Sequence, residues 1–101
     1  MPSNTEPLRE VTPSPARPVR ILYFAWVREK IGHAEEMREL PTGVATIADL
    51  IAWLKTLGPE YAEGFARESV VRAAVDQRHV KHDALIGGAR EIAFFPPVTG
   101  G

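Results

Sequence analysis

The feature that most constrains the fold is one amphipathic helix, which the sequence predicts between Thr46 and Leu57. Thr46 suits the N-cap position, and Asp49 three residues later completes the pattern of a capping box. Gly58 and Pro59 follow and are residue types that end a helix. The apolar side chains recur every three or four residues and so form one stripe: Ile47, Leu50, Ile51, Leu54 and Leu57. A stripe of this length needs a sheet against which to be buried.

Segments with the composition of β-strands lie on both sides of this helix. Residues 19–27 read VRILYFAWV and combine β-branched with aromatic side chains. Successive strand side chains point to opposite faces, which gives two sets here. One set is Ile21, Tyr23 and Ala25, and the other is Leu22, Phe24 and Trp26. Both sets are apolar, so we expect a central strand that is covered at least partly on both faces.

The rest of the chain supplies partner strands and short connections. Further strands are predicted at residues 35–40, 70–75, 79–80 and 91–95. The connections are predicted as a polar turn and loop at 28–33, a short helical connector at 61–69, a tight turn at 76–78 and a loop at 83–88. Two strands, a helix and a return to strands indicate the α+β class, with a mixed β-sheet packed on one main α-helix.

The amino-acid composition argues against several classes of function. The 101 residues include 12 basic and 13 acidic side chains, so the basic excess typical of nucleic-acid binding is missing. No apolar run approaches the roughly 20 residues of a membrane-spanning helix. The chain has no cysteine, which excludes disulfides, thiolate zinc sites and a cysteine nucleophile of its own. We therefore expect neither nucleic acid nor membrane as a partner.

The N-terminal segment differs from the rest of the chain. Residues 1–18 hold five of the nine prolines, and proline neither pairs well in a sheet nor propagates a helix. The segment lacks the apolar core of a secretory signal and the pattern of a transit peptide. We expect a disordered extension at 1–18, an ordered domain at 19–95, a flexible tail at 96–101 and a cytoplasmic location.

The C-terminal tail carries the functional prediction. The last strand runs into Pro96-Pro97-Val98-Thr99-Gly100-Gly101. The prolines favour a stiff, extended segment, and the two glycines can enter a tunnel that any Cβ would block. The terminal carboxylate has a reference pKa of about 3.5 and is a poor electrophile at neutral pH. Acyl chemistry at Gly101 therefore needs external activation, most simply by a partner that uses ATP.

Three segments resemble the small subunit of molybdopterin synthase, the sulfur carrier of molybdenum cofactor biosynthesis. Residues 93–101, AFFPPVTGG, resemble the family's C-terminal signature, and residues 19–30, VRILYFAWVREK, resemble its first strand and turn. Residues 74–77, AVDQ, resemble its third strand, although asparagine is more usual than Asp76. Two features depart from the family pattern: the proline-rich extension, and the loop 87–90, which is less acidic than the usual turn before the last strand.

The resemblance implies a ubiquitin-like β-grasp fold and a division of labour between partners. An ATP-dependent activating enzyme would adenylate the Gly101 carboxylate, and a sulfur donor protein would convert it to a thiocarboxylate. The tail, with Gly100 and Gly101 at its reacting end, would deliver sulfur to cyclic pyranopterin monophosphate inside the large subunit of a heterotetramer. The chain would be no enzyme on its own and would bind no cofactor, since the ATP belongs to the activating partner.

Several further residues have two interpretations each. Phe24 and Phe95 either dock a partner or are buried, and Arg28 either pairs with a partner's acidic group or is simply solvated. Trp53 is interpreted as packing at the edge of the core rather than as ligand stacking. The remaining expected partner contacts are in the tail, at Pro96, Pro97, Val98 and Thr99. No metal site is expected at His79, His82 and Asp83, because the spacing offers no further ligand.

Three other functions stay open at this level. A ubiquitin-like modifier would form an isopeptide bond through Gly101, and a thiamin-type sulfur carrier would share the Gly-Gly ending. A non-covalent interaction domain would have an incidental Gly-Gly end. Deletion of Gly101 separates this last possibility from the others, because it would leave folding and non-covalent binding intact.

Overall fold

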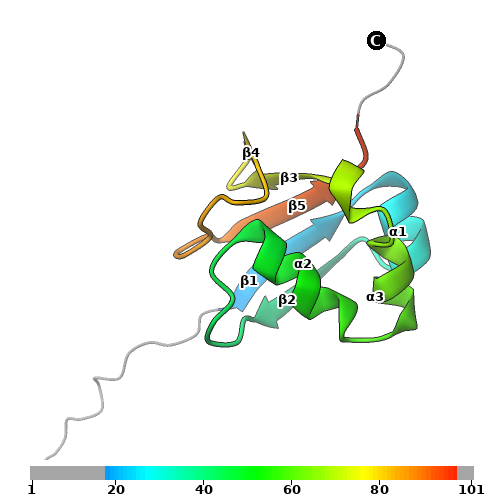
Figure 1. Cartoon of the computed structure of the whole chain (residues 1–101), viewed down its shortest axis with the longest axis horizontal. Coiled ribbons are helices and arrows are strands. Elements are labelled where there is room, and N and C mark those ends of the chain that lie inside the picture. Colours follow the sequence, from blue (N-terminus) through cyan, green and yellow to red (C-terminus); the bar gives the residue numbers. More distant parts are fainter. Residues whose placement is uncertain (1–17, 98–101) are drawn as a thin grey trace, which may run out of the picture.

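The computed structural model describes residues 18–97, which form a five-stranded sheet with helices on one face (Figure 1). The strand order is β2-β1-β5-β3-β4. The central pair β1 and β5 is parallel, and the other neighbours are antiparallel. The strands are β1 (Pro18–Tyr23), β2 (Glu35–Glu39), β3 (Arg72–Val75), β4 (Arg78–Val80) and β5 (Glu91–Phe95). The predicted α+β class and mixed sheet are confirmed.

Helix α2 (Ile47–Lys55) forms the centre of the helical layer, and its capping box is present as predicted. The Thr46 hydroxyl accepts a hydrogen bond from Asp49 N, and the Asp49 carboxylate accepts one from Thr46 N, both at 3.1 Å. The predicted end of the helix was wrong. Helix α2 ends at Lys55, and Gly58 instead caps the start of the next helix, in which Pro59 is the first residue. Proline suits that position because its missing N–H has no partner there.

The long strand predicted at residues 19–27 was also wrong. Strand β1 ends at Tyr23, and the chain turns at Ala25, whose φ is 53°, into helix α1 (Ala25–Ile31). The predicted polar turn at residues 28–30 therefore lies within this helix. Val27 and Ile31 are its buried residues, and their spacing of four is the helical signal that the continuous apolar run concealed.

Helix α3 (Pro59–Gly64) and the short 3₁₀ helix η2 (Glu68–Val70) occupy the predicted helical connector. Helices α1 and α3 lie against each other beside α2 (Figure 1). A Cβ at Gly64 would lie 2.8 Å from the Ile31 side chain, so glycine allows this close approach. The Lys55 ammonium and the Glu68 carboxylate, 2.6 Å apart, connect α2 to η2.

The predicted tight turn joins β3 to β4. Asp76 and Gln77 have φ values of 50° and 72°, the left-handed pair that a two-residue hairpin loop requires. The Asp76 carboxylate accepts hydrogen bonds from Arg90 N and Glu91 N, both at 3.0 Å. The turn is thereby fixed to the start of β5.

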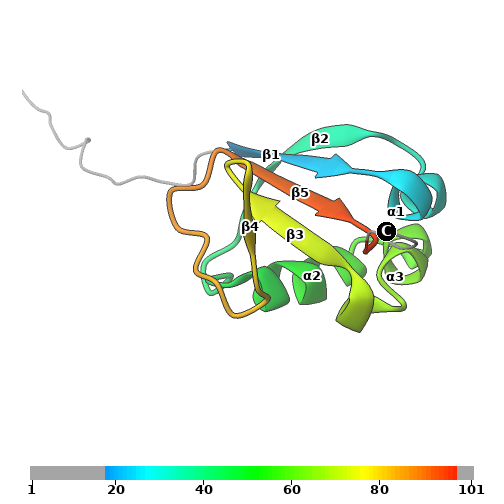
Figure 2. The same cartoon turned by 90° about the horizontal axis from the view of Figure 1, so that it is seen from above.

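The core lies between the sheet and the helices, and Figure 2 shows α2 and α3 on one side of the strands. The apolar stripe of α2 is buried as predicted, and Trp53 packs at the edge of the core. The predicted central position of β1 is confirmed. On the face away from the helices, Leu22 is half-buried and Arg20 is exposed, so this face is covered only in part. Within residues 18–97, no helix is long and apolar enough to cross a membrane.

Candidate functional site

The root of the C-terminal tail emerges from the middle of the sheet. Strand β5 is hydrogen-bonded to β1 on one side and to β3 on the other, and it ends at Phe95. Phe95, Pro96 and Pro97 are each half-buried. Strands β1 and β3, on the two sides of β5, therefore fix the position from which the tail starts. Val98, Thr99, Gly100 and Gly101, to which the sequence assigns the chemistry, lie outside the described residues.

Phe24 lies at the same end of the sheet as the tail root. Its backbone N–H donates to Phe94 O at 3.0 Å, which joins the end of β1 to the end of β5. The Phe24 side chain is 45% exposed, so burial in the core is excluded. Phe24 comes directly after β1, outside the sheet, and occupies the N-cap position of α1. Arg28, four residues on, is exposed on that helix, and partner contact at either residue stays a prediction.

The face of the sheet away from the helices carries an uncovered apolar band. Leu22 pairs in register with Ala93, and Phe95 stands two residues further along the same strand face. Met37, on β2, is 59% exposed. Phe95 lies against His79 of β4, with 5.2 Å between ring centroids. This "open face" is defined here by Leu22, Met37, Ala93 and Phe95. Phe95 adjoins the tail root, Ala93 is buried, and Met37 lies toward the other end of the sheet, in register with Arg20.

The two histidines considered as metal ligands have other contacts. His82 Nε2 lies 2.7 Å from Val71 O, so this nitrogen donates its hydrogen to the carbonyl. His79 packs on Phe95, as described above. Within residues 18–97, no three histidine, aspartate or glutamate side chains gather in a way that could hold a metal ion.

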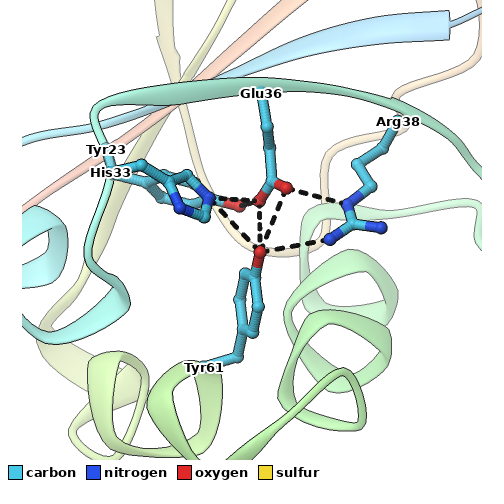
Figure 3. A network of polar contacts seen from close by, with 5 residues as sticks. All are labelled: Tyr23, His33, Glu36, Arg38 and Tyr61. Atoms are coloured by element: carbon cyan, nitrogen blue, oxygen red, sulfur yellow. Dashed lines mark hydrogen bonds and ion pairs between the residues drawn. The ribbon is translucent and has the colours of Figure 1, made fainter.

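A polar network centred on Glu36 joins β2 to the helical layer (Figure 3). The hydroxyl groups of Tyr23 and Tyr61 donate to the Glu36 carboxylate at 2.7 and 2.8 Å. Arg38 donates to Glu36 from Nε at 2.9 Å and to the Tyr61 hydroxyl at 3.2 Å. His33 Nε2 lies 3.2 Å from the same carboxylate. The network therefore connects five side chains from β1, the loop before β2, β2 itself and α3.

The electrostatics of this network favour the ionised carboxylate. Burial acts to raise the pKa of Glu36, but hydrogen bonds from Tyr23, Tyr61 and His33 outweigh it and hold that pKa below its usual value. Burial and the neighbouring Glu36 carboxylate raise the pKa of Tyr23 far above the usual range of a phenol. Both tyrosines thus remain neutral donors at neutral pH, as a structural anchor requires.

The sequence analysis missed this network. One signal was available in strand β2, whose apolar Met37 points outward while Glu36 and Arg38 face the helices. This alternation is the reverse of that in an ordinary half-buried strand. A charged pair two residues apart on the inner face requires polar partners, and the two tyrosines provide them.

Comparison with known proteins assigns this architecture. The model of the ThiS family matches residues 21–101. Molybdopterin synthase sulfur carrier subunits are similar over most of their length. The protein from Mycosarcoma maydis is 39% identical over 90 residues, which cover 82% of this chain and 92% of the relative. The Escherichia coli K12 protein is 32% identical over 83 residues, covering 82% and 99% respectively.

Solved structures agree with the fold. A Pyrococcus furiosus protein that is 32% identical superposes with a TM-score of 0.62 and covers 80% of this chain and 98% of its own. SAMP1 from Haloferax volcanii is 19% identical, with a TM-score of 0.63, and covers 84% of this chain and all of its own. At that identity SAMP1 supports the fold alone. The ubiquitin-like β-grasp fold expected from the sequence is confirmed.

Proposed function

The chain belongs to the ThiS family, in which its curated relatives are molybdopterin synthase sulfur carrier subunits, and from this premise we propose that Gly101 carries sulfur as a thiocarboxylate. The observation that carries the proposal is the family match through residue 101, which includes the Gly100-Gly101 end. Gly101 holds the free carboxyl group in this proposal. The rigid support of the tail root is the structural feature that fits it.

Two steps load the sulfur. A carboxylate oxygen of Gly101 attacks the α-phosphorus of ATP on an activating enzyme, and pyrophosphate leaves. A hydrosulfide equivalent from a sulfur donor then attacks the acyl carbon of this mixed anhydride, and AMP leaves with the oxygen. The product keeps one oxygen and one sulfur on the terminal carbon. Sulfur stands on the backbone terminus, so the carrier needs no cysteine, and this chain has none.

Delivery follows on the large subunit of molybdopterin synthase. The tail enters that subunit's active site, where its narrow glycine end can pass. The thiocarboxylate sulfur attacks a carbon of the pterin precursor, cyclic pyranopterin monophosphate, and displaces the oxygen substituent of that carbon. Water then cleaves the bond between the sulfur and the acyl carbon, so the sulfur stays on the pterin and Gly101 returns as a carboxylate. The carrier contributes one nucleophilic atom on an arm, and the partner contributes the pocket and the catalytic groups. The exposed Phe24 and the half-buried Phe95 of the open face lie at the end of the sheet from which this arm departs.

Intact mass spectrometry tests the loading step. The full chain is incubated with its activating enzyme, ATP and a sulfur source, and the expected product has one oxygen exchanged for sulfur at Gly101. Deletion of Gly101 is expected to abolish the exchange while the unfolding transition stays unchanged. The activating enzyme is shown beforehand to work on another carrier, so an unmodified chain would overturn the proposal.

The same spectra separate the rival function of a protein modifier. A modifier forms an amide bond between Gly101 and a lysine of another protein, so a covalent conjugate of higher mass replaces the thiocarboxylate. Sulfur loading without transfer to the precursor, in the presence of the large subunit, would indicate a carrier of another pathway.

A further inference from the structure

A hollow of about 380 Å³ opens at the root of the tail, on the edge of the sheet formed by β3 and β4. Four of its lining residues have basic side chains and none is acidic; the basic residues are Arg72, His79, Lys81 and His82. Arg72 and Lys81 are exposed in it, and Pro97 forms part of its wall. The lining residues are Ser69, Val70, Val71, Arg72, Ala73, His79, Val80, Lys81, His82 and Pro97. We call this feature the basic hollow.

Three acidic residues lie near the hollow in the sequence, and none of them lines it: Glu68, Asp76 and the exposed Asp83. Glu68 pairs with Lys55 at 2.6 Å, and the Asp76 carboxylate accepts two backbone hydrogen bonds at the start of β5. Within residues 18–97, the structure records no ion pair for Arg72 or Lys81. Among the described residues, no carboxylate therefore lies within the lining of the hollow to balance its guanidinium and ammonium groups.

The position of the hollow connects it to the open face. Arg72 pairs in register with Phe95 and shares its face of the sheet, since Ala73 and Phe94 beside them are buried on the helical face. The opposite edge of that face is acidic, with exposed Glu35 and Glu39 on β2. The face away from the helices thus has a basic edge at the tail root and acidic residues on β2. Between them lie the apolar residues of β1 and β5, with Arg20 and Glu91 at the far end of these strands.

We propose that the basic hollow docks an acidic segment of the large subunit, the partner into which the tail inserts. This inference rests on the proposed function. A protein that holds the tail beyond Pro97 must approach the wall of the hollow, and carboxylates are the groups that complement unpaired guanidinium and ammonium groups. The apolar residues of β1 and β5 supply contact area, and the charge gradient across the face fixes the orientation of the partner.

Binding of the full chain to the purified large subunit tests the proposal, with association and dissociation rates measured at several salt concentrations. The test variant is Arg72→Gln/Lys81→Gln. The matched control is Arg78→Gln/Arg90→Gln, which removes the same charge from two exposed arginines at the end of β3 and β5 opposite the tail root, outside the lining of the hollow. Both variants leave the tail and the buried core unchanged.

We expect the test variant to bind about tenfold more weakly, mainly through slower association, and to lose most of its salt dependence. The control should stay within about twofold of the parent. Equal affinities for the parent and the test variant would overturn the proposal, as would equal losses in test and control variants.

Sulfur loading at Gly101, followed by mass spectrometry, separates this inference from the proposed function. An unloaded parent chain would contradict the function itself. A loaded parent whose test variant binds normally would contradict only the basic hollow.

Discussion

Phe94 and Phe95 are neighbours in β5, and their surroundings show how the two faces of the sheet differ. The Phe94 ring is fully buried and lies 5.0 Å from Phe65 and 6.4 Å from Tyr23, centroid to centroid. Phe95 is half-buried and has His79 as its aromatic neighbour. One face therefore holds the fold together, and the other keeps apolar surface free for a partner. A carrier that passes between proteins needs both in one small domain.

The largest expected effect on stability is that of Phe94→Ala. Removing this ring leaves a cavity between β5 and the helices, and the free energy of unfolding should fall by about 3–5 kcal/mol. Phe95→Ala, one residue away, should cost no more than about 1 kcal/mol. Urea denaturation measures both values. Similar losses for the two variants would show that the faces do not differ in the way described.

The Glu36 network gives the next largest effect, because it is the polar part of the helical face. Glu36→Gln should cost about 1–3 kcal/mol at neutral pH, since Arg38 loses its charge partner and two tyrosines lose an ionised acceptor. Its pKa is lower in the folded chain than in the unfolded one. The stabilisation is therefore present above the unfolded pKa and disappears as pH falls through the folded pKa.

Urea denaturation across a pH series measures how the free energies of unfolding of the parent and of Glu36→Gln approach each other in acid. The two chains should differ most near pH 7. The difference should start to shrink as pH falls below the ordinary carboxyl pKa of about 4 and should vanish only below the lower folded pKa of Glu36. Glu35→Gln, an exposed neighbour on the same strand, is the control and should follow the parent at every pH. A difference between parent and Glu36→Gln that persists unchanged in acid would contradict the ionised anchor.

The sequence predicted correctly the elements whose local residue pattern agrees with their tertiary contacts. Its predictions were wrong where the local pattern favours another structure than the one those contacts stabilise. The capping box and the apolar stripe of α2 act within one helix, so both were visible. The run from Val19 to Val27 is apolar except at Arg20, which hides the helical spacing of Val27 and Ile31 and the packing of α1 against α3. The Glu36 network includes contacts between residues up to 28 positions apart, and the basic hollow depends on the pairing of β3 with β4. The reversed alternation of β2 signals that Glu36 and Arg38 face inward, but no short window identifies the partners of either feature.

The capping box permits a smaller test of the helical face. Thr46→Ala removes the hydroxyl that accepts from Asp49 N and should lower stability by about 1 kcal/mol. Thr42→Ala, in the exposed turn before the helix, should have no measurable effect. Thermal or urea unfolding measures the stability of the two variants relative to the parent. Equal stabilities would show that the cap contributes nothing beyond what water supplies.

The smallest effect on folding, and the clearest contrast between the faces, is expected at Phe24. Its side chain is 45% exposed, so Phe24→Ala should change the free energy of unfolding by less than about 0.5 kcal/mol. Affinity for the large subunit should nevertheless fall about tenfold, because aromatic side chains supply a large share of interface energy. Leu85→Ala is the matched control: Leu85 is 76% exposed, but it lies in the loop between β4 and β5.

Stability and affinity of the two variants are measured side by side. Leu85→Ala should leave both quantities unchanged, which would show that exposed apolar area matters only near the tail root. If both variants lost affinity equally, binding would depend on general hydrophobicity rather than on this end of the sheet. If Phe24→Ala unfolded the chain instead, Phe24 would belong to the core-forming side of the molecule despite its exposure.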